Sequence, residues 1–492
     1  MTLKTKKNVH RTVCRIDRKT KAVTAGVNFE DIDLTIEGEG SEVYDYEYML
    51  VVHNQMSTSS NIYVRVNDLT SYDWSLMNGV ANGSALADVS TNSYADLLLS
   101  RLSGYPSISK GKITGYIGNK RHVDCLNSIS SQTLQQVRKS STYTTDTSTE
   151  LTSFQLFSVS SETITYTLVI TAVPKIQYNP NAVLLKHIKL INQTADIIFG
   201  GVNDTEGVDD LDGDVYDYYV MSSGLIGTES FNIYLNDSLL SNKNRQLLYN
   251  SNGSLVSQYS AGINNDGAVT GTGQSCITSD TGKKKITTTS SSRTTATQQV
   301  ETYVSNSDTS TKLTSILLRV SVGSPSGNVQ LYAVPKGYNA DLTPWTYRQV
   351  VNIAGDFSAG KSFEIPSDAL FMKVDFVGDN NGFVSLIANF NDTTQTHSNQ
   401  YLKSLGSATS ASSATGQADM RVARIDDESK SEFIMSLKSG ANRPSMFKAV
   451  QDADEIRFYG QWLEDSSTVL TSVQIKASNS NSISGLLTVS FY

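Results

Sequence analysis

Two short phrases occur three times along the chain, and their order and spacing limit the possible folds more than any other feature. The first phrase is a strand-like stretch that ends in Asn-Asp, and its copies end at Asp68, Asp237 and Asp392. The second phrase contains Leu-Thr-Ser, and its copies begin at Thr149, Thr311 and Thr468. The two phrases lie 81, 74 and 76 residues apart. This regularity predicts three tandem copies of one domain.

The segments around these phrases have the two-residue period of β-strands. Apolar and polar side chains alternate over residues 61–66 and again over 163–171. Residues 313–333 contain two apolar stretches around Gly323-Ser-Pro-Ser-Gly327, which predicts a hairpin. The threonine-rich run 287–297 predicts an exposed strand pair, because threonine favours strands. Only Tyr94–Leu102 has a pattern that suggests a short helix or crossover.

The fold class that follows is all-β, with three tandem jelly-roll-like β-sandwich domains behind a short basic N-terminal arm. A chain of 492 residues exceeds the roughly 250–300 residues at which single cores stop growing. Many short strands with polar connections favour sandwiches over propellers or solenoids, whose repeats are shorter. We expect the domains to span residues 26–175, 182–336 and 345–492, after an arm of residues 1–25.

Charge is distributed unevenly between this arm and the rest of the chain. Residues 1–25 carry eight Lys or Arg and one acid, a net charge of +7, whereas the remaining 32 basic and 47 acidic residues give −15. A basic arm on an acidic body suggests docking to a partner, and a solvated terminus is the alternative. The candidate docking residues are Lys4, Lys6, Lys7, Arg11, Arg15, Arg18, Lys19 and Lys21.

Cysteine usage and hydropathy bear on the compartment. Cys14, Cys125 and Cys276 are too scattered for a disulfide framework or a zinc site, which suits synthesis in a reducing cytosol. The N-terminus has no apolar core of a secretory signal. No run of about 18 apolar residues exists, so we expect no membrane span.

Motifs that carry chemistry are weak. The string Gly355–Ser362 fits the phosphate-binding pattern G-x-x-x-x-G-K-S, but proline at 366 leaves no room for the required helix, so a glycine turn is expected. Asp210-Leu-Asp212-Gly-Asp214 resembles half of a calcium loop, and an acidic turn is the simpler interpretation. His122-Val-Asp-Cys125 has no counterpart in the other copies. We predict no enzyme activity, no cofactor and no metal.

The order of these phrases resembles a known family. Each copy has a strand ending in Asn-Asp, a Thr- and Ser-rich middle, Leu-Thr-Ser and a final strand pair, and two begin with Val-Tyr-Asp-Tyr, at Val43 and Val215. This order resembles the repeated jelly-roll-like modules in virion proteins of tailed bacteriophages, found in head-decoration, head-fibre and tail-associated components. The third copy lacks Val-Tyr-Asp-Tyr and departs most from the pattern.

The resemblance implies a structural virion protein, made in the host cytoplasm. Its expected partners are other virion proteins of the capsid, portal or tail, with assembly into a homo-oligomer such as a trimer and no specific nucleic acid. The arm would attach it to the particle. A receptor- or glycan-binding module on the same particle remains an alternative, as does a polysaccharide hydrolase with its active site in loops.

Overall fold

The chain forms β-strands and no helix over the residues that the structure describes, which confirms the all-β class. The structure is a computed structural model. The described residues are 11–492 except for the following gaps: 54–60, 69–71, 81–84, 95–96, 102–105, 115–121, 130–135, 145–147, 175–181, 227–229, 237–242, 252–253, 262–267, 271, 280–284, 294–297, 307–309, 321–322, 337–346, 381, 392–396, 406–407, 418–419, 426–428, 438–442, 452–454 and 464–467.

The strands fall into three sets of twelve in chain order. The first set is β1 Arg11–Val23, β2 Asn28–Asp33, β3 Tyr44–Val52, β4 Asn61–Val66, β5 Tyr72–Val80, β6 Ala85–Tyr94, β7 Leu97–Arg101, β8 Ser107–Thr114, β9 His122–Ile129, β10 Gln136–Thr144, β11 Ser153–Ser158 and β12 Glu162–Pro174. The second set is β13 Val183–Leu190, β14 Ile197–Phe199, β15 Tyr216–Ile226, β16 Ser230–Leu235, β17 Lys243–Ser251, β18 Ser254–Ala261, β19 Ala268–Thr270, β20 Thr272–Thr278, β21 Lys285–Arg293, β22 Gln298–Asn306, β23 Ile316–Val320 and β24 Ser326–Pro335. The third set is β25 Tyr347–Asp356, β26 Lys361–Glu364, β27 Phe371–Asn380, β28 Val384–Phe390, β29 His397–Leu405, β30 Ala408–Gln417, β31 Met420–Ile425, β32 Ser429–Ser436, β33 Arg443–Gln451, β34 Glu455–Leu463, β35 Ser472–Ala477 and β36 Ser482–Phe491.

The strands of the first set pair in a nested manner. The first strand pairs with the last, β1 with β12, and then β2 with β11, β3 with β8 and β4 with β7, all antiparallel. This wrapping of a folded-over chain is the order of a jelly roll. Two hairpins, β5–β6 and β9–β10, extend one of its sheets, so that the strand order is β1-β12-β3-β8-β9-β10-β5-β6 opposite β2-β11-β4-β7.

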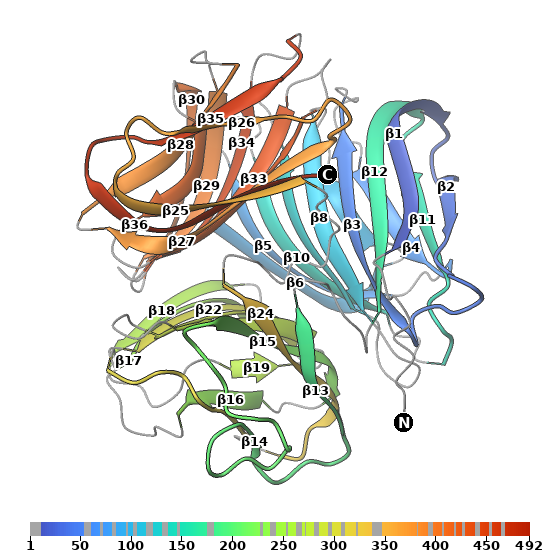
Figure 1. Ribbon diagram of the computed structural model, residues 1–492. Coiled ribbons are helices and arrows are strands. Elements are labelled where there is room, and N and C mark those ends of the chain that lie inside the picture. The colour runs from blue at the N-terminus through green and yellow to red at the C-terminus, as the bar shows by residue number, and fades with distance from the viewer. Residues whose placement is uncertain are drawn as a thin grey trace.

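The same strand order recurs in the second and third sets, each with an eight-stranded and a four-stranded sheet. We call the three bodies the first sandwich (11–174), the second sandwich (183–335) and the third sandwich (347–492). Each has a separate apolar core between its two sheets. Figure 1 shows the first sandwich in blue and cyan, the second in green and yellow and the third in orange and red.

The two repeated phrases lie against each other in every sandwich. Asn67, Asn236 and Asn391 each have a positive φ, 52°, 54° and 51°, and directly follow a strand of the smaller sheet. The side-chain oxygen of Asn236 accepts hydrogen bonds from the backbone amides of Thr314 (2.8 Å) and Ser315 (3.3 Å), and its amide group donates to the carbonyl of Lys312. The same set of bonds joins Asn67 to residues 150–153 and Asn391 to residues 469–472.

These bonds explain the near-constant spacing of the phrases. Asparagine tolerates a left-handed backbone better than most residues, and its side chain can satisfy both donors and acceptors of a neighbouring loop. Leu151, Leu313 and Leu470 of the second phrase are buried, so the loop that the asparagine holds also covers the core. We call this arrangement the asparagine clamp.

Residues 11–23 correct the predicted arm. They form β1, the edge strand of the larger sheet, paired with β12 from Arg11 opposite Ala172 to Val23 opposite Glu162. The charge pattern concealed this strand, because an edge strand faces solvent on one side and tolerates Lys and Arg there. The first sandwich therefore begins before residue 26.

Four local expectations can also be compared with the structure. Of the two possibilities for 94–102, the helix is wrong where the structure describes it, because residues 97–101 are strand β7. The crossover agrees with the topology, because β6 and β7 belong to different sheets. The predicted hairpin around Gly323–Gly327 is wrong in its pairing, because β23 and β24 belong to different sheets. The string Gly355–Ser362 ends β25 and begins β26, so a turn replaces any phosphate-binding helix. The run 287–297 lies in β21 up to Arg293, and the rest falls outside the described residues.

Candidate functional site

The larger sheets of the three sandwiches lie toward a common centre (Figure 1). The hairpins β5–β6, β17–β18 and β29–β30 meet there, since β6, β18 and β30 each lie against the other two. The candidate functional surfaces are therefore of two kinds, the faces through which the sandwiches contact one another and the charged strands and loops at the periphery.

Corresponding positions form two of these contacts. Tyr218 of β15 and Met372 of β27 occupy equivalent positions in the second and third sandwiches. Tyr218 pairs with Ile277 and Met372 pairs with Met435, so the residues just before these partners, Cys276 of β20 and Ile434 of β32, also correspond. By the same registers, Lys430 of the third sandwich corresponds to Ile108 of the first. A surface that contacts a different surface on its neighbour makes a head-to-tail interface, the type that closes into rings.

The junction of the first and third sandwiches is mainly apolar. Ile108 and Ile434 belong to one buried cluster with residues of both sandwiches: Met49, Val51, Val169, Leu370, Phe371, Met446 and Tyr492. Lys110 borders it with an ion pair to Glu432 at 3.0 Å. Such a cluster resembles a domain core more than a transient contact.

The junction of the second and third sandwiches has a polar contact at the corresponding place. The Nζ atom of Lys430 lies 2.6 Å from Sγ of Cys276 and over the ring of Tyr219, 5.4 Å from its centre. Burial lowers the pKa of Lys430, but the Cys276 sulfur and the Asp217 carboxylate raise it more, so its pKa lies above the usual value. Cys276 and Tyr219 are buried in an apolar cluster that also contains Val173 of the first sandwich.

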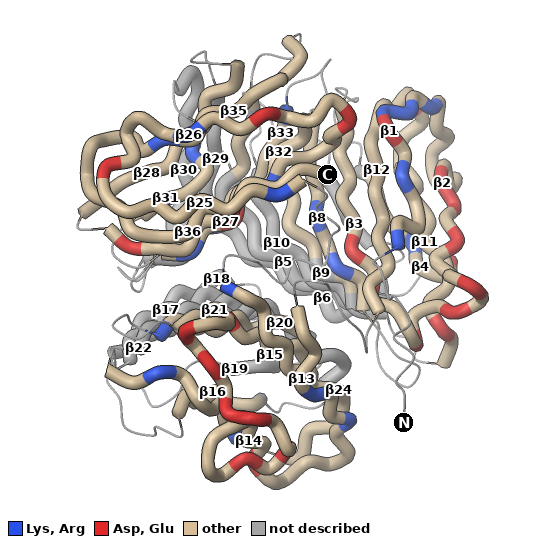
Figure 2. Tube along the Cα trace, in the orientation of Figure 1, with Lys and Arg blue, Asp and Glu red and all other residues tan. Residues whose placement is uncertain are grey.

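The basic residues of β1 mostly contact residues of their own sandwich. Arg11 donates to Glu37 at 2.6 Å, and Lys19 donates to Glu30 at 2.6 Å. Lys21 donates to the carbonyl of Phe29. Figure 2 shows these cations along β1 beside the acidic residues of β2.

Arg15 and Arg18 complete the described part of the candidate docking set. Arg15 donates to the carbonyl of Asp368 and lies 5.6 Å from the ring centre of Tyr492, so it joins the first sandwich to the third. Arg18 has a positive φ of 46° at an irregularity of the strand, where its amide donates to Thr167. The remaining three candidates, Lys4, Lys6 and Lys7, lie outside the described residues.

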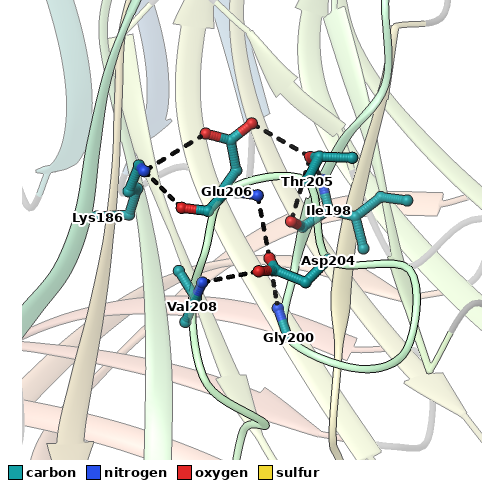
Figure 3. Close-up of polar contacts among 7 residues, drawn as sticks. All are labelled: Lys186, Ile198, Gly200, Asp204, Thr205, Glu206 and Val208. Atoms are coloured by element: carbon teal, nitrogen blue, oxygen red, sulfur yellow. Dashed lines mark hydrogen bonds and ion pairs between the residues drawn. The ribbon is translucent and has the colours of Figure 1, made fainter.

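An acidic loop of the second sandwich follows β14 and is held by its own side chains (Figure 3). The carboxylate of Asp204 accepts hydrogen bonds from the backbone amides of Gly200 (3.1 Å), Glu206 (3.1 Å) and Val208 (2.8 Å). Partial burial raises the pKa of Asp204, but these donors lower it more, so its pKa lies below the usual value. Lys186 of β13 donates to the carbonyl of Glu206.

The predicted acidic turn at 210–214 is built in the same way. Asp212 forms an ion pair with Lys312 at 2.7 Å and accepts from the amide of Asp214, while Asp210 accepts from the amide of Gly201. Within the described parts of the chain, no three acidic, histidine or cysteine side chains gather closely enough to hold a metal ion. The contacts support the interpretation as a structural turn.

Comparison with known proteins adds no family. No protein-family model matches the chain, and no curated protein matches it. The described residues contain no helix that is long and apolar enough to cross a membrane.

Proposed function

We propose that this chain is a structural component of a tailed-phage virion, attached to the capsid or tail. The observation that carries the proposal is the head-to-tail packing of three sandwiches with one strand order around a common centre. Jelly-roll sandwiches are a common building unit of viral shells, and head-to-tail interfaces are how such units form rings. A single chain of this kind supplies three units in fixed proportion.

The structure narrows the proposed anchor from residues 1–25 to a shorter segment. Residues 11–23 are part of a sheet and their cations contact acidic residues or carbonyls of the same chain, so they are poor candidates for a free anchor. We propose that residues 1–10, with Lys4, Lys6 and Lys7, make the contact with an acidic particle surface.

Two deletions test the role and the anchor separately. Particles assembled with a chain lacking residues 1–10 should sediment without it, although the purified variant keeps the unfolding temperature of the full chain. Deleting residues 1–23 should lower that temperature as well, because β12 loses one of its two partner strands. Normal incorporation of the shorter deletion would overturn the anchor alone. Absence of the full chain from gradient-purified particles would overturn the virion role, and saturable binding on a glycan array would then favour a lectin.

A further inference from the structure

The contact between Lys430 and Cys276 is unusual because of its length. Nζ and Sγ are 2.6 Å apart, although the residues belong to different sandwiches and lie 154 positions apart in the chain. Hydrogen bonds from nitrogen to oxygen usually measure about 2.7–3.2 Å, and sulfur is larger than oxygen. An ordinary hydrogen bond to sulfur would therefore be longer. A nitrogen and a sulfur bonded to one shared oxygen atom would lie this close.

We propose that Cys276 and Lys430 are a site of oxidative cross-linking, where a covalent S–O–N bridge joins the second sandwich to the third. The inference is independent of the virion role.

The overall reaction uses dioxygen as the oxidant and balances without another reactant. The Lys430 ammonium first gives one proton to water, and its amine and the thiol of Cys276 then react with one dioxygen molecule to give the S–O–N bridge and one water. The S–H bond, one N–H bond and the O–O bond break, and S–O and N–O bonds form. Sulfur and nitrogen each lose two electrons, and dioxygen takes up all four. Reduction takes four electrons: four thiol molecules return the amine and the thiol, release the bridging oxygen as water and form two disulfides. Two phosphine molecules and one water also return the amine and the thiol, and they form two phosphine oxides.

The surroundings favour this pair over the other cysteines. The Lys430 nitrogen already lies beside the Cys276 sulfur, so the two atoms that the bridge would join are adjacent. For cysteines without such a neighbour, the thiolate is the form that oxidises readily. Cys276 is only 5% exposed, so large oxidants are excluded while a small neutral molecule such as dioxygen can enter. By contrast, burial raises the pKa of Cys14 to about 11, and Cys125 lies in the apolar core of the first sandwich.

The bridge can form at only one of the two junctions described above. The corresponding pair between the first and third sandwiches is Ile108 and Ile434, which have no reactive atoms. Oxidation would thus hold the second and third sandwiches together covalently and leave the apolar junction unchanged.

Intact mass spectrometry of the full chain tests the proposal. Protein exposed to air without reductant should gain the mass of one oxygen atom less two hydrogen atoms, and phosphine treatment should remove this gain. Thiol titration after denaturation should find two thiols before reduction and all three cysteines after it. Peptide mapping should place the cross-link between Cys276 and Lys430.

Matched variants separate the bridge from other oxidation and from the ionic contact. Cys276→Ser and Lys430→Arg should both lose the mass gain, because arginine keeps the charge but does not supply the amine. Cys125→Ser should keep it. The unfolding temperature of the wild type should fall on reduction, and that of Lys430→Arg should not. Three free thiols after air exposure, a loss of two hydrogens without added oxygen, or oxygen on Cys276 without a cross-link would each overturn the proposal.

Discussion

At the residue scale, the asparagine clamp explains why the same two phrases recur in each repeat. Each clamp combines a left-handed backbone with side-chain bonds to a loop about 80 residues further along the chain. The sequence shows that the two phrases recur at constant spacing, but it cannot show that they touch, because their contact depends on how the sheets wrap. Recurrence of two polar phrases is nevertheless the signal from which such a contact can be suspected.

Replacing the second clamp residue should destabilise the second sandwich. Asn236→Ala leaves the amides of Thr314 and Ser315 without their acceptor, which should cost about 1–3 kcal/mol. Alanine at positive φ should add roughly 1 kcal/mol, whereas Asn236→Gly should avoid that part. Urea unfolding of both variants measures the two contributions. Equal stability of Asn236→Ala and the wild type would contradict the clamp.

The acidic loop makes a prediction about pH. The backbone amides around Asp204 hold its pKa below the usual value in the folded chain, so protons bind the unfolded chain more readily. Its stabilisation is fully present above the unfolded pKa of about 3.9 and is lost as the pH falls through the lower folded pKa.

Asp204→Asn tests this sign. Unfolding in urea should show a clear loss of stability at neutral pH and a smaller difference from the wild type near pH 3. Asp209→Asn, a change at an exposed neighbour, is the control and should alter stability little at either pH. A difference between Asp204→Asn and the wild type that grows on acidification would contradict the assignment.

At the scale of the element, alternation predicted individual strands well and their partners poorly. Residues 61–66 and 163–171 are strands as expected, because one side of each faces the core. The segment 97–101 is a strand despite its run of leucines, because pairing with β4 overrides local preference. The pairing of β23 and β24 with different sheets follows from the wrapping of the whole sandwich, which no local pattern encodes.

The turn between β25 and β26 offers a test at this scale. Gly360 has a φ of +68°, and a Cβ there would lie 2.6 Å from the carbonyl oxygen of Ile475. Gly26 has a similar φ of +71° but open space around it. Gly26→Ala should cost roughly 1–2 kcal/mol from backbone strain, and Gly360→Ala should cost more, because the clash is added. Thermal unfolding of the two variants compares them, and equal losses would contradict the close packing of this turn.

At the scale of the whole molecule, composition and repeats indicated three sandwiches but not how they pack. The positions that join them, Ile108 with Ile434 and Lys430 with Cys276, lie far apart in sequence and read as ordinary outward-facing strand residues. The basic strand β1 also takes part in this packing, because Arg15 contacts the ring of Tyr492 and so joins the first sandwich to the third. The Lys and Arg side chains of β1 therefore stabilise contacts within the chain.

The junction between the first and third sandwiches can be weakened on its own. Ile434 is 1% exposed and packs between sandwiches rather than in the core of the third. Ile434→Ala should weaken this packing by about 2–5 kcal/mol. Small-angle X-ray scattering should then report a larger radius of gyration, with the strand content in circular dichroism unchanged. Val202→Ala, at a 98% exposed side chain, is the control. An unchanged radius in Ile434→Ala would contradict the role of the cluster.

We propose that one chain places three sandwiches around a common centre as a structural block of a virion. A cryo-electron-microscopy reconstruction of purified particles tests it most directly. We predict density at defined, symmetry-related sites on the capsid or tail that fits three sandwiches in contact, with the N-terminal residues toward the particle. Particles that lack such density, or density in which the sandwiches are separated from one another, would contradict it.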